Sequence, residues 1–178
     1  IQGFFDIPVD HLFSSPVMVR HLKTLGLKDP VVVGPDVGGI KMARAYAKSL
    51  GAGLAIVDKR RVSPEAAEAV HVIGEVEGKT VILVDDMIST AGTITEASKA
   101  GAAHGAKEVL VSATHAVLCG PAVQRLSSAP LRSVIVTDTI PPALSSGVRN
   151  LHVLTISELL GEAIRRIHQS ESVSSLFL

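Results

Sequence analysis

The stretch that organises this sequence is residues 81–93, which read Val81-Ile82-Leu83-Val84-Asp85-Asp86-Met87-Ile88-Ser89-Thr90-Ala91-Gly92-Thr93. Its first four residues are apolar, and such a continuous run is typical of a strand that is covered on both faces. Two adjacent carboxylates, Asp85 and Asp86, come directly after this strand. A segment with hydroxyl side chains and a glycine follows and leads into a helical pattern. The stretch therefore predicts a strand, an acidic edge, a loop and a helix, in that order.

The same stretch has the composition of a sugar-phosphate site. A helix begins with unpaired backbone N–H groups and a partial positive charge, so residues 89–93 suit a bound phosphate. Asp85 and Asp86 can accept hydrogen bonds from neighbouring sugar hydroxyls or hold Mg²⁺. An acidic strand-to-helix turn with a good cap would look similar, although capping alone does not require two carboxylates before the loop. We therefore expect a sugar phosphate to bind here.

The rest of the sequence alternates between strand patterns and helix patterns. Strand, helix and strand at this spacing favour right-handed crossovers and parallel pairing. The predicted fold class is therefore α/β, with a mostly parallel sheet flanked by helices. The other predicted strands are 31–33, 54–57, 109–111, 134–136 and 151–154, and the predicted helices are 15–25, 40–50, 93–105 and 156–168. Residues 62–68 are expected to form an exposed loop before the apolar run 70–76.

Several residues mark the expected helix ends. Ser15 before Pro16 predicts one helix start, because a hydroxyl cap followed by a first-turn proline is favoured there. Thr93 and Glu96 have the spacing of a capping box and predict the start of another helix. Gly51 predicts a helix end, because glycine readily adopts the left-handed conformation found after a last turn.

Composition excludes several classes of protein. The chain has 178 residues, 17 Lys plus Arg and 17 Asp plus Glu, so no basic excess indicates a nucleic-acid or membrane-surface binder. Aromatic residues make up only 3%, which disfavours a base-stacking surface. The single cysteine, Cys119, excludes an intramolecular disulfide and fits a reducing compartment. No apolar run approaches the roughly 18 residues that cross a bilayer. We expect a soluble, cytoplasmic protein with neither nucleic-acid nor membrane partners.

Polar residues after the predicted strands are the next candidates, because ligands in open parallel sheets bind beyond the carboxyl ends of the strands. Asp36 is followed by two glycines, so a carboxylate that can hold a hard cation lies beside backbone that a ligand can approach closely. Asp36 could equally be an ordinary helix cap. Residues 59–61 read Lys-Arg-Arg, which without further context is most often a solvated basic turn. His115 is more readily explained as a structural histidine than as an acid or base.

Further motifs lie outside residues 81–93. They are residues 3–10 (Gly-Phe-Phe-Asp-Ile-Pro-Val-Asp), 34–39 (Gly-Pro-Asp-Val-Gly-Gly), 57–61 (Val-Asp-Lys-Arg-Arg), 114–115 (Thr-His), 119–122 (Cys-Gly-Pro-Ala) and 171–177 (Glu-Ser-Val-Ser-Ser-Leu-Phe). Together with residues 81–93, these motifs resemble the ribose-phosphate pyrophosphokinase family, also called phosphoribosyl pyrophosphate synthetases, which has the type I phosphoribosyltransferase fold. The resemblance spans essentially the whole chain and corresponds to the carboxyl-terminal half of the family.

The resemblance implies an enzyme that depends on Mg²⁺. The C1 hydroxyl of ribose 5-phosphate would attack the β-phosphorus of ATP, giving phosphoribosyl pyrophosphate and AMP. Such a reaction needs positioning and charge neutralisation rather than a covalent intermediate. Two alternatives stay open: a non-catalytic regulatory relative that keeps the fold, and a phosphoribosyltransferase that consumes phosphoribosyl pyrophosphate.

The resemblance also implies roles for individual residues. One departure is Ser89, which stands where many relatives carry an aspartate. The implied catalytic residues are Lys59 and Arg61; the ribose 5-phosphate-binding residues are Asp85, Asp86, Ser89, Thr90, Ala91, Gly92 and Thr93; the pyrophosphate loop is Asp36, Val37, Gly38 and Gly39; the metal ligand is Asp36; and the allosteric residues are Asp10, Ser172, Ser174 and Phe177.

Partners and domains follow from the same resemblance. It implies a homo-oligomer, in the family a hexamer of dimers, with ADP and phosphate as possible effectors, although a frayed terminus is the simpler interpretation of residues 172–177. Residues 1–154 would form the phosphoribosyltransferase-like domain, 155–170 a helix that packs on an amino-terminal domain missing from this sequence, and 171–178 a tail that returns to the domain. The chain alone is therefore expected to be incomplete for activity.

Overall fold

A seven-stranded sheet forms the centre of the structure, a computed structural model that describes residues 2–60, 69–141 and 147–177. The strand order is β3-β2-β1-β4-β5-β6-β7. All neighbours are parallel except β3, which pairs with β2 in the antiparallel direction. This arrangement confirms the predicted α/β class. The strands are β1 (Pro30–Gly34), β2 (Gly53–Arg60), β3 (Ala69–Ile73), β4 (Thr80–Ile88), β5 (Glu108–Ala116), β6 (Ser133–Thr137) and β7 (Leu151–Leu154).

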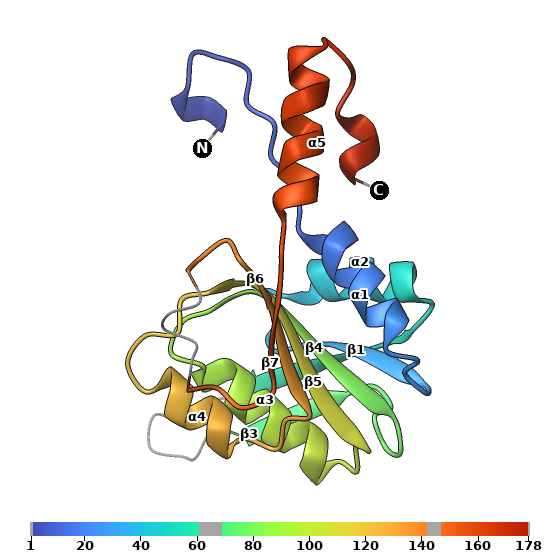
Figure 1. Cartoon of the computed structure of the whole chain (residues 1–178). Coiled ribbons are helices and arrows are strands. Elements are labelled where there is room, and N and C mark those ends of the chain that lie inside the picture. Colours follow the sequence, from blue (N-terminus) through green and yellow to red (C-terminus); the bar gives the residue numbers. More distant parts are fainter. Residues whose placement is uncertain (1, 61–68, 142–146, 178) are drawn as a thin grey trace.

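Helices cover both faces of this sheet (Figure 1). The helices α1 and α2 share one core with the sheet, and α3 and α4 share another on the opposite face. The helices are α1 (Ser15–Thr24), α2 (Ile40–Leu50), α3 (Gly92–Ala103), α4 (Ala122–Ser128) and α5 (Ser157–His168), with short 3₁₀ helices η1 (Gln2–Phe4) and η3 (Ser174–Phe177). No described helix meets the length and hydropathy that a membrane span requires.

The continuous apolar runs are explained by this double cover. Successive strand side chains point to opposite faces. In β4, Val81 and Leu83 therefore pack on the α3 and α4 side, whereas Ile82 and Val84 pack on the α1 and α2 side. Every one of these four side chains is buried. A strand with two dry faces cannot alternate apolar with polar residues.

The helix ends confirm one prediction and correct two. Gly51 follows α2 with φ +65°, the left-handed conformation that ends a helix. The predicted capping box at Thr93 is wrong, because α3 begins at Gly92 and its N-cap is Ala91. The methyl side chain of alanine cannot accept a hydrogen bond from the first N–H groups of the helix. The first helix is capped at Ser14 rather than Ser15, and the Ser14 hydroxyl instead bonds Thr114 across 2.6 Å.

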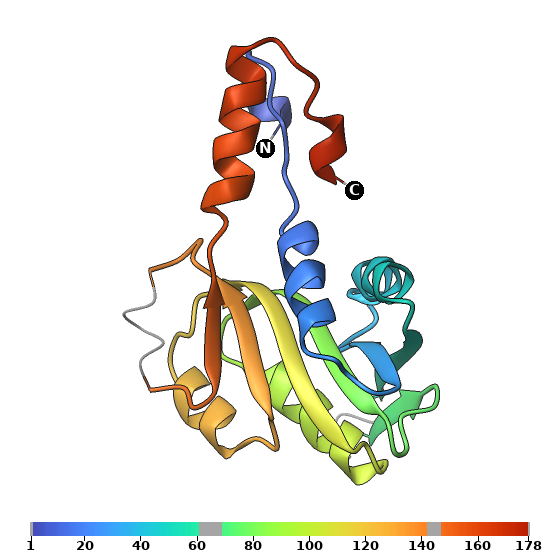
Figure 2. The same ribbon diagram turned by 45° about the vertical axis from the view of Figure 1, so that its right-hand side comes forward.

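Helix α5 extends away from the sheet, flanked by the amino-terminal segment and by η3 (Figures 1 and 2). The tail after α5 is bound to it by an ion pair between Arg165 and Glu171 at 2.9 Å, and Arg165 also pairs with Glu162 of the same helix at 2.8 Å. One side of α5 stays apolar and exposed, with exposed fractions of 43% for Leu160, 67% for Ile164 and 56% for Ile167. Ala163 of the same helix is buried, so the apolar side chains of α5 are divided between a buried and an exposed side.

The two-sided core predicts which isoleucines stabilise the fold. Ile82 on β4 is fully buried, whereas Ile73 on the edge strand β3 is 55% exposed. Ile82→Ala should lower the free energy of unfolding by about 2–5 kcal/mol, because it leaves a cavity in a packed core. The matched variant Ile73→Ala should cost less than about 1 kcal/mol. Urea denaturation of both variants tests this, and equal losses would contradict the assigned core.

Candidate active site

The site lies where the direction of the chain across the sheet changes. Strands β1 and β4 are parallel neighbours, and from there the sheet grows through β2 and β3 on one side and through β5 to β7 on the other. Val33 pairs with Leu83, so the loop that follows β1 and contains Asp36 lies beside the last residues of β4. Strand β4 runs to Ile88 and therefore includes Asp85 and Asp86 rather than ending before them, as the sequence had indicated. Such a switch point is where open α/β sheets bind ligands.

The loop after β1 folds closely around its own carboxylate. The backbone N–H of Gly39 donates to Asp36 Oδ1 across 2.9 Å. A Cβ atom on Gly38 would lie 3.2 Å from the same oxygen, and one on Gly34 would lie 3.2 Å from the Asp36 carbonyl oxygen. The glycines therefore permit the close approach of backbone to carboxylate that the sequence indicated. Asp36 and Val37 are both exposed at this edge.

Asp85 occupies the least favourable position of the three acids for a negative charge. The pKa of Asp85 is raised to about 6, chiefly by burial and also by the neighbouring carboxylates of Asp86 and Asp36. The Asp86 N–H, which donates to Asp85 Oδ1 across 2.9 Å, opposes the rise only in part. Asp85 thus lies near both other carboxylates at the edge between β1 and β4, and a ligand that donates hydrogen bonds or carries positive charge would relieve the repulsion on its charge.

The segment after β4 encloses a small hollow at the start of α3. Ala91 is buried there with φ +59°, a left-handed backbone that non-glycine residues seldom adopt. The first N–H groups of a helix have no partner within the helix, so this hollow suits an anion. Its volume is about 120 Å³, and it is lined by Asp85, Met87, Ile88, Ser89, Thr90, Ala91, Gly92, Thr93 and Ile94. All five predicted phosphate-loop residues are therefore brought together with Asp85.

A second segment fixes this loop. The backbone N–H of Leu118 donates to the Ile88 carbonyl across 2.9 Å, and that of Cys119 donates to the Ser89 carbonyl across 3.1 Å. The Cys119 sulfur also lies 3.3 Å from Ser89 Oγ, and Cys119 is exposed rather than packed as an apolar residue. Finally, Arg125 Nη1 donates to the Thr90 carbonyl across 3.0 Å. Sequence reasoning missed Arg125, which lies 35 residues from Thr90 in the chain.

The predicted catalytic loop is described only in part. Lys59 lies near the carboxyl end of β2, where its backbone pairs with Val70 of β3. Its side chain, the whole of Arg61 and the expected loop at 62–68 lie outside the described residues. The structure therefore places the backbone of Lys59 on β2, which is the neighbour of β1. The loop that contains Asp36 follows the carboxyl end of β1.

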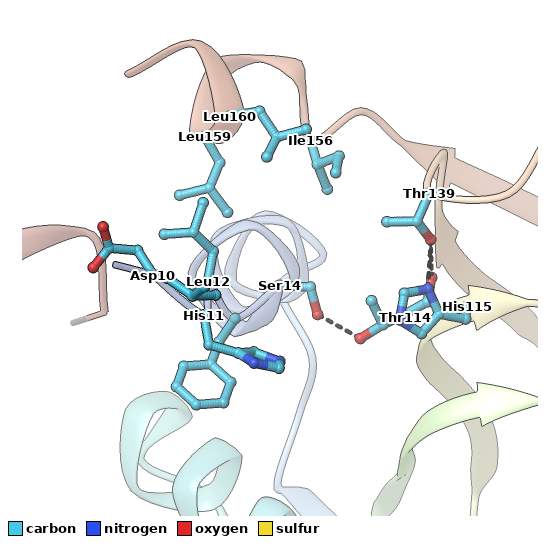
Figure 3. A pocket seen from close by; sticks show the side chains of 12 residues that line it. Asp10, His11, Leu12, Ser14, Thr114, His115, Thr139, Ile156, Leu159 and Leu160 are labelled. Carbon is cyan, nitrogen blue, oxygen red and sulfur yellow. Dashed lines mark hydrogen bonds between the residues drawn. The ribbon is translucent and has the colours of Figure 1, made fainter. Parts of the chain in front are cut away.

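A larger cavity opens between α5 and the ends of β5 and β6 (Figure 3). It has a volume of about 350 Å³ and is lined in part by Asp10, His115 and Thr139. His115 Nδ1 shares a hydrogen bond of 2.8 Å with the Thr139 hydroxyl. This contact orients the His115 ring, and the structural role that the sequence favoured stays a prediction.

The four predicted regulatory residues form two groups. Asp10 and Phe177 line one pocket of about 460 Å³ together with Gln2, His11 and Phe13. The hydroxyls of Ser172 and Ser174 bond each other across 3.1 Å on the tail after α5 and do not line that pocket.

The carboxylate oxygens at the acidic edge are suitable ligands for Mg²⁺, but they do not form a complete coordination shell. Within residues 2–60, 69–141 and 147–177, no three or more His, Cys, Asp or Glu side chains are grouped so that they could hold a metal. Asp36, Asp85 and Asp86 nevertheless supply hard oxygen ligands that repel one another. Mg²⁺ is usually held by one or two carboxylates together with water and substrate phosphates, so a partial donor set is sufficient.

The switch-point acids and the anion-suited loop define an α/β protein of the type I phosphoribosyltransferase fold. Adenine phosphoribosyltransferase from Saccharomyces cerevisiae shares this fold at 22% identity, with a TM-score of 0.53 over 66% of this chain and 74% of that one. Phosphoribosylpyrophosphate synthetase from Mycobacterium smegmatis is much more similar, at 41% identity and a TM-score of 0.86 over 95% of this chain and 55% of that one.

Sequence comparison identifies the family. The profile of the phosphoribosyl synthetase-associated domain matches residues 61–178. Ribose-phosphate pyrophosphokinase from Gloeobacter violaceus is 54% identical over 99% of this chain and 54% of its own length. The chain belongs to the phosphoribosyl synthetase family, and it spans about half the length of the curated relatives it matches.

The raised pKa of Asp85 predicts how this residue affects stability. The folded-state pKa of about 6 lies above the ordinary value of 3.8, so ionising Asp85 disfavours the folded state as the pH rises through 6. With chelator present, Asp85→Asn should match the wild type near pH 4 and be more stable by about 1 kcal/mol at pH 7.5, after allowance for solvent screening.

Urea denaturation at several pH values measures this difference. The matched control is Asp29→Asn, which removes an exposed carboxylate at a position with φ +44° that asparagine tolerates. Its stability difference from the wild type should change much less with pH. A difference for Asp85→Asn that shrinks as the pH rises would contradict the assigned burial of Asp85.

Proposed function

We propose that this chain forms the ribose 5-phosphate-binding part of a Mg²⁺-dependent ribose-phosphate diphosphokinase. The reaction transfers the diphosphoryl group of ATP to the C1 hydroxyl of ribose 5-phosphate and yields phosphoribosyl pyrophosphate and AMP. The observation that carries the proposal is the hollow at the start of α3 beside Asp85. Membership of the phosphoribosyl synthetase family and 54% identity to a ribose-phosphate pyrophosphokinase support it.

The acidic edge and the loop hold opposite ends of the sugar in this proposal. Asp85 and Asp86 accept hydrogen bonds from the ribose hydroxyls, which compensates the unfavourable burial of the Asp85 charge. The 5-phosphate lies against residues 89–93, where backbone N–H groups and hydroxyls donate to its oxygens. Because both ends are fixed, the C1 hydroxyl is oriented toward the neighbouring Asp36 loop, and positioning of this kind lowers the barrier to transfer.

The loop 36–39 receives the diphosphoryl group. Its glycines keep side chains out of the way, so backbone can approach the phosphates. Asp36 would hold Mg²⁺, which neutralises the charge of the phosphates when it is bound. Lys59 and Arg61 supply further positive charge as the bond to AMP breaks.

Several properties of the whole protein belong to the same proposal. Ribose 5-phosphate and ATP are its substrates, and it assembles as a homo-oligomer in the cytoplasm. ADP and inorganic phosphate act as effectors at Asp10, Ser172, Ser174 and Phe177. The shared pocket of Asp10 and Phe177 supports this regulatory site, as does the binding of the tail to α5 through Arg165.

The proposed bond cleavage predicts a specific product. The full-length protein with Mg²⁺ and ATP should release AMP only when ribose 5-phosphate is added. Combined Lys59→Ala and Arg61→Ala should reduce the rate by at least about a hundredfold, because charge neutralisation in the transition state is lost. Chromatography of the nucleotides measures this. Release of ADP instead of AMP would show that another phosphoryl bond is cleaved, and the diphosphokinase assignment would then fall.

The exposed side of α5 generates a further prediction. In the proposal this side, formed by Leu160, Ile164 and Ile167, packs on another part of the full-length protein. The 178-residue chain alone should therefore self-associate as its concentration rises, because an apolar patch favours burial. Ile164→Glu should abolish this association, whereas Ala103→Glu, an equally charged change on an exposed part of α3, should not. Sedimentation velocity distinguishes the outcomes, and a wild-type chain that stays monomeric would contradict the packing.

A further inference from the structure

The guanidinium of Arg125 lies against the phosphate loop from a helix that the proposed mechanism does not use. Arg125 belongs to α4, and its Nη1 donates to the Thr90 carbonyl across 3.0 Å. A Cβ atom on Gly92 would lie 3.4 Å from the same Nη1. The guanidinium therefore bonds Thr90 and lies next to the space into which a side chain at position 92 would project. The hollow itself is not lined by Arg125, so these contacts reach the loop from outside.

The hydrogen bond from Arg125 is the third of three that fix consecutive carbonyl groups of the loop. The carbonyls of Ile88, Ser89 and Thr90 accept from Leu118 N–H, Cys119 N–H and Arg125 Nη1. The first two donors are backbone N–H groups, which every residue type except proline would supply at these positions. The third donor is a side chain, and it alone depends on the residue type at its position. Loss of Arg125 would therefore release the Thr90 carbonyl, the one of the three that is nearest to α3.

The Thr90 carbonyl determines where the next amide points. In a trans peptide the C=O and the following N–H point in opposite directions. Because the Thr90 carbonyl is directed at Arg125, the Ala91 N–H is directed away from Arg125. Ala91 also keeps its left-handed φ of +59°, a conformation that persists only where the surroundings impose it. The hydrogen bond from Arg125 to the Thr90 carbonyl constrains the peptide directly before Ala91.

The charge of Arg125 addresses a second need of this site. Among the residues that the structure describes, the side chains that line the hollow include the carboxylate of Asp85 and no lysine, arginine or histidine. A phosphate dianion there would meet backbone dipoles and hydroxyls, with a carboxylate nearby. The guanidinium behind Thr90 and Gly92 adds positive charge close to the anion without occupying the space that the anion needs.

We propose that Arg125 is a positioning residue for the phosphate group of a phosphorylated sugar. It fixes the Thr90–Ala91 peptide so that the loop presents its amides to the phosphate, and it acts through the backbone rather than by touching the ligand. The inference rests on the proposed function, because the ligand is taken to be ribose 5-phosphate. It adds a residue outside the acidic stretch to the determinants of substrate affinity.

The test compares ribose 5-phosphate affinity among variants of the full chain by titration calorimetry. Arg125→Ala should raise the Kd about tenfold, the factor that corresponds to 1.4 kcal/mol. Arg125→Lys keeps the charge and a donor and should retain most of the affinity. Arg132→Ala is the matched control, because Arg132 is paired with Glu108 at 2.8 Å on the opposite end of the sheet. It should bind as the wild type does.

Amide spectra separate positioning from a general effect on folding. On titration with ribose 5-phosphate, the Ala91 and Gly92 amide signals should shift in the wild type and in Arg125→Lys, and much less in Arg125→Ala. Signals from β4 core residues such as Ile82 should be the same in all three. Should Arg125→Ala fail to fold, Arg125→Gln serves with the same expectation, because its shorter neutral side chain lacks the guanidinium.

Three results would overturn the inference. An Arg125→Ala chain that binds as tightly as Arg132→Ala would show that Arg125 does not affect phosphate binding. Loss of native signals across the core in both Arg125→Ala and Arg125→Gln would show a role in folding instead. In both cases the proposed function would stand, since the wild type binds. A wild-type chain that binds no ribose 5-phosphate would overturn the proposed function itself, and the inference with it.

Discussion

The parallel pairing of β1 with β4 is the constraint on which the site depends. It sets residues that are 50 positions apart in the sequence side by side, as the register of Val33 with Leu83 shows, and β4 continues past this level to Ile88. The loops that follow then meet at the switch point, where no further strand separates them. The buried side chains of β1 and β4 hold this register, because they pack into two cores on opposite faces of the sheet. The packed sheet therefore positions the polar residues at its edge.

The edge itself is held in an unfavourable state. Burial and two nearby acids raise the pKa of Asp85, and Ala91 keeps a left-handed backbone that its side chain disfavours. Neither feature stabilises the folded chain. Both become favourable when a ligand supplies hydroxyl donors to Asp85 and an anion to the amides after Ala91, which is the pattern expected where binding has been favoured at the expense of stability.

Much of the fold and the main site could be predicted from the sequence, because they depend on local patterns. The apolar run before Asp85 predicted a central strand, and the residues that follow predicted the anion loop at its end. The start of α3 could not be predicted from Thr93 and Glu96, because the loop requires the helix to begin at Gly92, after a left-handed Ala91. The contact of Arg125 with Thr90 depends on how α4 packs beside α3, and no motif records that packing. The antiparallel direction of β3 could not be predicted either, because it depends on how β3 pairs with β2 and not on the residues of β3 alone.

A crystal structure of the chain with ribose 5-phosphate tests the central claim most directly. The account predicts that the ribose hydroxyls lie within hydrogen-bonding distance of Asp85 and Asp86, with the phosphate in the hollow lined by Ser89 to Thr93. Arg125 should remain bonded to the Thr90 carbonyl behind it. A sugar phosphate bound instead between Asp10 and Phe177, with the hollow at α3 empty, would contradict the account.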